Sequence, residues 1–152
     1  MRVAPSADEQ VRGALSALGQ IESYAPASLL ILHANPDAAP KDVARVTDDL
    51  QREHLVEYVT PVLQDARTGS RQILTDEITV RLRPEAPQKG TLTDMRRAEG
   101  VSVAHRNEFV RTQYTLKVPK ASGTRTLEVA KRLQKRADVE FAAPNYIVDI
   151  KR

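Results

Sequence analysis

Hydrophobic positions in the first half of the chain follow the periods of helices and strands in turn. Val11, Leu15 and Leu18 are spaced i, i+4, i+7, as on one face of a helix. Ser6 or Asp8 can cap this helix at its start. We predict strands over 21–24, 29–33 and 55–63, and a second helix over 41–53. The order helix, strand, strand, helix, strand indicates a mixed α+β unit.

The second half opens with a strict alternation of apolar and polar residues over 77–83. Ile78, Val80 and Leu82 fall on one side of this half-buried strand. A short helix follows, capped by Thr91 and ending at 98, and then come strands over 101–105 and 113–118, a helix over 124–137 and a final extended segment over 139–150. This order predicts a ferredoxin-like βαββαβ fold, with two helices on one face of an antiparallel sheet. We expect the polar turn at 65–70 to divide the chain into units 1–70 and 71–152.

The two halves also resemble each other in sequence. Residues 55–61, LVEYVTP, match 138–144, DVEFAAP, and the helices that precede these segments match as well. We therefore expect a degenerate duplication. Only residues 1–3 precede the first helix, so the first unit is predicted to be an incomplete αββαβ copy that lacks most of its opening strand. A missing strand leaves an unpaired sheet edge, to which a partner strand can add.

Composition limits the classes of protein. A chain of 152 residues can bury a substantial core. The absence of cysteine excludes a disulfide framework, a thiol nucleophile and a thiolate metal site. The longest aliphatic run, residues 29–32, is far too short for a membrane span or a signal-peptide core. We therefore expect a cytoplasmic protein without a membrane partner.

The net charge of +3 is unevenly distributed. Residues 1–74 carry 7 Lys and Arg against 10 Asp and Glu, a net charge of −3, and residues 75–152 carry 16 against 10, a net charge of +6. A basic half beside an acidic half suggests an acidic partner or nucleic acid, although a solvated surface with chance clustering explains the division equally well.

The sequence contains no recognisable catalytic set. The three histidines lack metal-ligand spacing, the glycines do not form a phosphate-binding loop, and a nucleophile-elbow motif is absent. We expect neither an enzyme nor a cofactor, metal or small-molecule substrate. RNA-binding domains share the predicted fold, but residues 108–114 lack their glycines and aromatic spacing. Phe109 and Tyr114 are better interpreted as core or hairpin residues.

One segment resembles a known family. Residues 139–146, VEFAAPNY, follow a predicted helix and resemble the end of the propeptide domain of subtilisin-type serine proteases. The strand segments 76–82 and 114–118 are similar to that family's first and third strands, so the resemblance covers about residues 75–150. Family propeptides usually follow a signal sequence and precede a catalytic domain, and this sequence shows neither.

The resemblance implies a stand-alone inhibitor of a subtilisin-like serine protease that forms a 1:1 complex, with a folding-chaperone role as a further expectation. Such propeptides pack the open face of their sheet on two surface helices of the protease, and their C-terminal segment lies in the active-site cleft. Carried over by position, the docking residues are Glu140, Phe141, Pro144 and Asn145, and the inhibitory tail is Tyr146, Ile147, Val148, Asp149, Ile150, Lys151 and Arg152.

Two other interpretations stay open from the sequence. The chain can be a basic, ferredoxin-like nucleic-acid-binding protein, although the closing motif makes a protein partner the stronger expectation. It can also be the excised propeptide of a larger protease precursor, with the same chemistry in a different biological setting.

Overall fold

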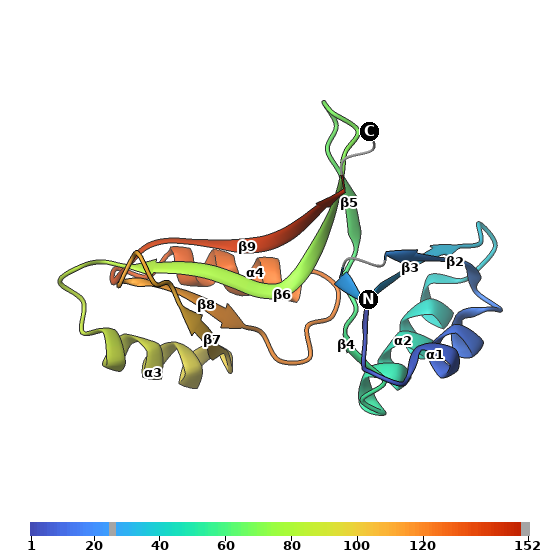
Figure 1. Ribbon diagram of the computed structural model, residues 1–152, viewed down its shortest axis with the longest axis horizontal. Helices are drawn as coiled ribbons and strands as arrows, with labels where there is room; N and C mark the ends of the chain where they lie inside the picture. The colour runs from blue at the N-terminus through green and yellow to red at the C-terminus, as the bar shows by residue number, and fades with distance from the viewer. Residues whose placement is uncertain (25–26, 150–152) are drawn as a thin grey trace. The chain divides into compact units, whose positions relative to one another are not determined.

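The chain folds into two compact units in the computed structural model, which describes residues 1–24 and 27–149. The units are Met1–Val59 and Thr60–Arg152. The first unit has the element order βαββαβ, the second unit has the same order after one additional strand, and both sheets are antiparallel (Figure 1). The predicted α+β class, with its ferredoxin-like arrangement, is confirmed.

The first unit contains β1 (Arg2–Val3), α1 (Asp8–Leu15), β2 (Gly19–Tyr24), β3 (Leu29–Ala34), α2 (Pro40–Arg52) and β4 (Val56–Tyr58). Its strand order is β2-β3-β1-β4. The expectation that most of the opening strand is missing is confirmed, because β1 has only two residues, but this short strand lies in the middle of the sheet and not at an edge. Arg2 pairs with Leu29 on one side and Tyr58 on the other, so two residues are enough to connect β3 and β4.

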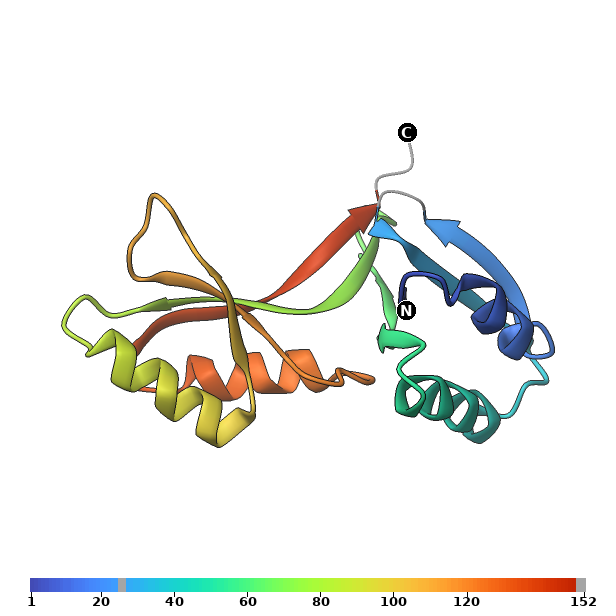
Figure 2. The same cartoon turned by 60° about the horizontal axis from the view of Figure 1, so that its bottom comes forward.

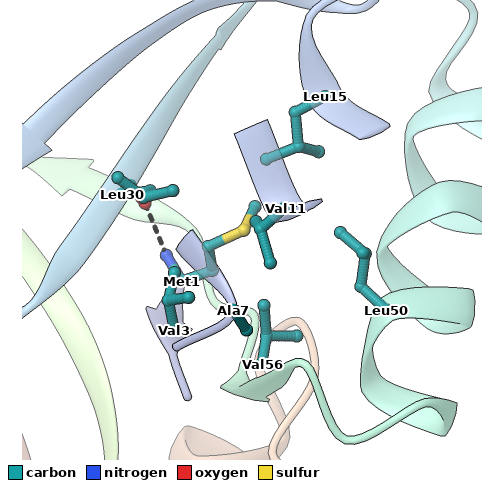
Figure 3. Packing of buried hydrophobic residues seen from close by; sticks show 8 residues of the cluster. All are labelled: Met1, Val3, Ala7, Val11, Leu15, Leu30, Leu50 and Val56. Atoms are coloured by element: carbon teal, nitrogen blue, oxygen red, sulfur yellow. Dashed lines mark hydrogen bonds between the residues drawn. The ribbon is translucent and has the colours of Figure 1, made fainter. Parts of the chain in front are cut away.

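One hydrophobic cluster holds the first unit together (Figure 3). Val11 and Leu15 of α1 are fully buried, as their spacing predicts, and Leu50 of α2 packs in the same cluster. Val3 and Val56 contribute from the sheet. Because both helices share one cluster with the sheet, α1 and α2 pack on the same face. The Met1 amino nitrogen donates to the Leu30 carbonyl oxygen at 2.9 Å beside this cluster.

The second unit contains β5 (Val62–Gln64), β6 (Arg71–Leu82), α3 (Gln88–Glu99), β7 (Ser102–Arg106), β8 (Gln113–Lys117), α4 (Arg125–Gln134) and β9 (Val139–Asp149). The long strand β6 pairs with β5, β8 and β9, and β8 pairs with β7. Apart from β5, the order β7-β8-β6-β9 repeats that of the first unit. Figure 2 shows α3 and α4 together on one face of this sheet, with the other face open.

A hairpin begins the second unit earlier than the sequence suggests. The strand expected over 55–63 is two strands, β4 and β5, separated by residues 59–61. Of these residues, Pro61 has no N–H to donate to a ladder. The expected boundary at residue 70 therefore lies inside the β5–β6 hairpin. The Asp65 carboxylate accepts the main-chain N–H groups of Arg67 and Thr68 at 2.8 and 2.9 Å, and these bonds lower the pKa of Asp65.

The core of the second unit confirms the alternating pattern. Ile78, Val80 and Leu82 of β6 are fully buried, and Met95 of α3 and Leu133 of α4 are buried with them. The helix α3 begins at Gln88, directly after Pro87, so Thr91 is a buried position inside the helix and not its cap. In residues 1–24 and 27–149, no helix has the length and apolar character needed to cross a membrane.

Candidate docking face

The uncovered face of the second sheet carries a ladder of polar side chains. Alternate residues of β6, namely Glu77, Thr79 and Arg81, lie between the buried core positions and are partly exposed. The register pairs them with Lys117, Thr115 and Gln113 of β8, in that order. Directly opposed residues project to the same face of an antiparallel sheet. We call the surface formed by these six residues, together with His105, Phe141, Ala143 and Asn145, the open face.

Arg81 holds an aromatic ring on the open face. Its Nε and Nη2 atoms donate to the Gln113 side-chain oxygen at 3.2 and 2.8 Å. Its guanidinium carbon lies 4.9 Å from the centroid of the Phe141 ring, within the range of a cation–π contact. The register places Arg81 directly opposite Phe141 on β9. The arginine therefore connects β8, β6 and β9 across the centre of the face.

Asn145 is fixed next to this centre. Its side-chain oxygen accepts a hydrogen bond from the Thr79 hydroxyl at 2.8 Å, and its main-chain oxygen accepts one from the Thr75 hydroxyl at 2.9 Å. These bonds form where the pairing of β6 with β9 shifts register between Leu74 and Ile78. The two threonines therefore hold β9 in place where its regular pairing is interrupted.

The edge of the face next to β7 and β8 is polar. The His105 Nε2 atom lies 3.1 Å from the Thr115 hydroxyl oxygen. The Lys117 ammonium group lies 3.5 Å from a carboxylate oxygen of Asp76, whose side chain is only 3% exposed. Burial raises the pKa of Asp76, and the charge of Lys117 opposes that effect.

The four predicted docking residues do not share one face. Phe141 and Asn145 lie on the open face, as their contacts with Arg81 and Thr79 indicate. Glu140 is exposed next to the register shift at the start of β9. Pro144 lies opposite the buried Ile78, and therefore on the helix-covered side of the sheet. The cause is the two-residue period of a strand, which separates Pro144 from its neighbour Asn145.

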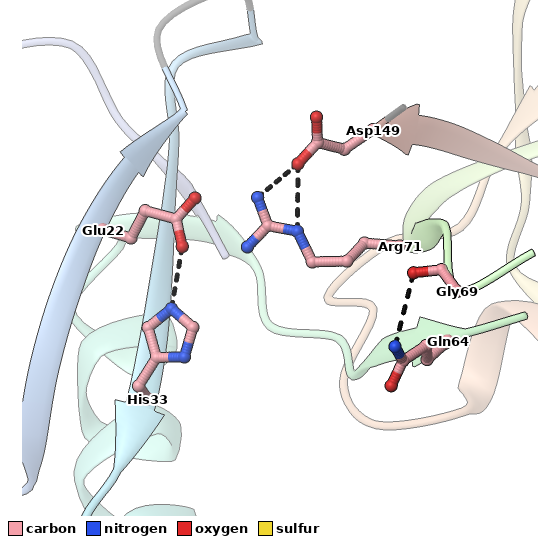
Figure 4. A network of polar contacts seen from close by, with 6 residues as sticks. All are labelled: Glu22, His33, Gln64, Gly69, Arg71 and Asp149. Carbon is pink, nitrogen blue, oxygen red and sulfur yellow. Dashed lines mark hydrogen bonds and ion pairs between the residues drawn. The ribbon is translucent and has the colours of Figure 1, made fainter. Parts of the chain in front are cut away.

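Part of the predicted tail is a strand and not a free extension. Tyr146, Ile147, Val148 and Asp149 pair with Leu74, Ile73, Gln72 and Arg71 of β6. The Arg71 guanidinium group holds the end of β9, with its Nε atom 2.9 Å from the Asp149 carboxylate (Figure 4). Nearby, the Gln64 side-chain nitrogen donates to the Gly69 carbonyl oxygen at 3.3 Å in the β5–β6 turn. The predicted tail residues Ile150, Lys151 and Arg152 lie outside the described residues.

Tyr114 and Phe109, which the sequence assigns to the core or to a hairpin, have opposite environments. Tyr114 is buried, with 6% of its surface exposed, whereas Phe109 is 92% exposed in the loop between β7 and β8. Sequence reasoning did not find Phe109 as a functional candidate. The available signal was Asn107 two residues earlier, because asparagine side chains accept main-chain N–H groups in tight turns.

The first unit offers a less developed polar surface. His33 and Glu22, on neighbouring strands of its sheet, lie 2.8 Å apart, and both side chains are exposed (Figure 4). The open face of the second unit, which is fixed by contacts among three strands, is therefore the stronger candidate site. Comparison with known proteins finds no matching family model, no similar curated protein and no similar solved structure.

Proposed function

We propose that this protein inhibits a subtilisin-like serine protease by docking through the open face of its second unit. Its C-terminal tail, residues 146–152, then occupies the active-site cleft. The observation that carries this proposal is the Arg81–Phe141 pair, which presents an aromatic ring on a sheet face that α3 and α4 leave uncovered. The same strand contains the VEFAAPNY segment that resembles the end of subtilisin propeptides.

The open face has the composition and rigidity of a protein-docking surface. Aromatic residues and arginine dominate the binding energy of protein interfaces. Arg81, Thr79 and Asn145 already make hydrogen bonds within the sheet. A partner therefore meets side chains that are largely ordered, and less conformational entropy is lost on binding. Glu77 and Lys117 add one charge of each sign, which favours a polar protein surface as the partner.

Docking by the face is favoured over strand addition at the middle of β9. The Ala142 N–H donates to the side-chain oxygen of Gln134 at 2.7 Å, so it is not available to another strand. Pro144, two residues later on the same edge, has no N–H. This part of the β9 edge therefore offers few donors to a partner strand, as is common for protected sheet edges.

Tail occupancy requires part of β9 to separate from β6. The Arg71–Asp149 ion pair and the pairing of Tyr146 with Leu74 hold this end of β9 in the free protein. An extended tail in a protease cleft can make new main-chain hydrogen bonds in their place. We therefore propose that the open face docks first. The tail then separates from β6 and binds in the active-site cleft of the protease.

Titration of subtilisin with the full chain tests the proposed function. Residual cleavage of a chromogenic peptide should fall to zero at a 1:1 ratio. A chain shortened after Asn145 should still dock but inhibit more weakly, and circular dichroism provides the folding control. No inhibition by the full chain contradicts the proposed function. Equal inhibition by both chains contradicts the role of the tail.

A second candidate is a nucleic-acid-binding protein, because Arg81 and Lys117 lie on the open face with Phe141. Arginine and exposed aromatic rings bind single-stranded nucleic acid by charge and stacking. Fluorescence anisotropy with labelled oligonucleotides at low salt tests this candidate. Binding that weakens steeply with added salt supports it, and unchanged anisotropy excludes it.

A third candidate, an excised propeptide, uses the same docking chemistry. The neighbouring reading frame distinguishes it from a stand-alone inhibitor. A protease domain encoded in the same frame after this segment supports the excised propeptide, whereas a separate protease gene beside it supports the stand-alone inhibitor.

A further inference from the structure

The loop between β7 and β8 presents one large apolar side chain to solvent. Phe109 lies in this loop, and 92% of its surface is exposed, far more than for Val103 of the adjacent strand, at 47%. A ring this exposed adds nothing to the core of the second unit. Single exposed apolar side chains are normal on protein surfaces. Phe109 is a candidate contact because its loop holds the ring in place beside the open face, and because aromatic rings are frequent hot spots of protein interfaces.

Hydrogen bonds hold the loop in one conformation. The Asn107 side-chain oxygen accepts the N–H groups of Phe109 and Val110 at 2.9 and 2.8 Å. The Asn107 N–H donates to the Gln113 carbonyl oxygen at 2.8 Å, which closes the base of the hairpin. The Arg106 Nε atom donates to the Arg111 carbonyl oxygen at 2.8 Å across the loop. The loop is therefore ordered before any partner binds, and binding requires little further ordering.

The loop belongs to the same surface as the open face. Figure 2 shows the β7–β8 loop rising from the sheet on the side away from α3 and α4. The closing bond from Asn107 to Gln113 links the loop to the residue that holds Arg81. A partner that covers the open face therefore meets the loop as well.

We propose that Phe109 is an apolar anchor that inserts into a pocket on the protein that docks against the open face. This inference rests on the proposed function and adds a second contact to it. The exposed neighbours Glu108 and Arg111 predict a pocket with an apolar floor and a polar rim of both charges.

Three variants measured against subtilisin test the anchor. Phe109→Ala should raise the inhibition constant about 30-fold, as expected for an aromatic hot spot, without changing the melting temperature. Asn107→Ala should raise it by a smaller factor, because the ring is kept but the loop is less ordered. Val103→Ala is the matched control, since it removes an exposed apolar side chain from the helix-covered side of the same hairpin, and it should inhibit like the wild type.

The outcomes distinguish the anchor from the proposed function. If the wild type inhibits subtilisin and Phe109→Ala inhibits it equally well, only the proposal that Phe109 is an anchor is overturned. No inhibition by the wild type overturns both proposals. Sedimentation of each variant provides a further measurement, because a wild-type dimer that Phe109→Ala dissociates with unchanged inhibition would assign the ring to a second copy and overturn the anchor. The anchor proposal is also overturned if Phe109→Ala loses binding to an oligonucleotide but inhibits subtilisin like the wild type.

Discussion

The guanidinium group of Arg81 lies over the ring of Phe141, and the two residues are directly opposed on neighbouring strands of the second sheet. The same guanidinium group donates two hydrogen bonds to Gln113 on the other side. The Phe141 ring is therefore positioned by Arg81, whose own conformation is fixed by its hydrogen bonds to Gln113. This relationship is the physical basis for treating the open face as a prepared docking surface.

Replacing Arg81 should weaken inhibition of subtilisin. Arg81→Ala removes the group that positions Phe141, and we expect the inhibition constant to rise about tenfold, within the range of interface arginines. Arg81→Lys should weaken inhibition nearly as much, because an ammonium group does not reproduce the planar pair of bonds to Gln113. Inhibition assays with both variants check this expectation, and a lysine variant as potent as the wild type would argue against positioning by the guanidinium group.

Weakening the end of β9 should improve inhibition. Asp149→Ala removes the ion pair with Arg71 that holds this segment on β6. If the tail must leave β6 to enter the cleft, the inhibition constant should fall by up to about fivefold, the range of a partly exposed ion pair. The measurement is the inhibition constant of Asp149→Ala beside that of the wild type. A higher inhibition constant for Asp149→Ala would contradict the expectation that separation of the tail from β6 limits inhibition.

The buried carboxyl group of Asp76 should make the free energy of unfolding depend on pH. Burial raises the pKa of Asp76 in the folded protein, so the folded state binds this proton more tightly than the unfolded state does. The contribution of Asp76 to stability therefore increases as the pH falls from 7 through this raised pKa. Asp76→Asn lacks the titration, so the free energy of unfolding of the wild type should rise relative to that of the variant on acidification.

Urea unfolding of the wild type and Asp76→Asn at pH 7, 5 and 4 measures this difference. The ion pair with Lys117 acts in the opposite direction, because it favours the ionised carboxylate. A difference that stays constant across the three pH values would mean that Lys117 cancels the effect of burial.

Removing a core side chain from α4 should destabilise the second unit. Leu133 is 1% exposed, and Leu133→Ala should lower the free energy of unfolding by about 3 kcal/mol through lost burial and a new cavity. Lys131→Ala on the exposed side of the same helix is the control and should change it by less than about 0.5 kcal/mol. Chemical unfolding followed by circular dichroism compares the two, and equal losses would contradict the packing of α4.

Periodicity predicts the fold well because burial imposes it locally. The alternation of Ile78, Val80 and Leu82 is enough to predict β6 and to assign its buried side. The sequence does not predict that residues 71–76 extend this strand, because that part depends on pairing with β5 and β9, which are distant in sequence or separated by a turn. The role of β1 is missed for a related reason, since a two-residue strand has no periodicity to read.

The candidate site is predictable only in part. Sequence reasoning identifies Phe141 and Asn145 through a motif, but a motif does not say which face of a strand each residue occupies. Pro144 is assigned to the docking set for that reason, although it lies opposite the buried Ile78. The Arg81–Gln113 bonds depend on the register between strands, and that register is fixed only when the whole sheet forms.

One substitution made on the two faces of the second unit tests the central claim most directly. Ala143 is exposed on the open face, and Ala98 is exposed on α3, which covers the opposite face. Inhibition constants against subtilisin should rise at least about 100-fold for Ala143→Arg, because a long cation separates the docked surfaces, and stay unchanged for Ala98→Arg. Equal inhibition by the two arginine variants, both folded by circular dichroism, would contradict docking through the open face.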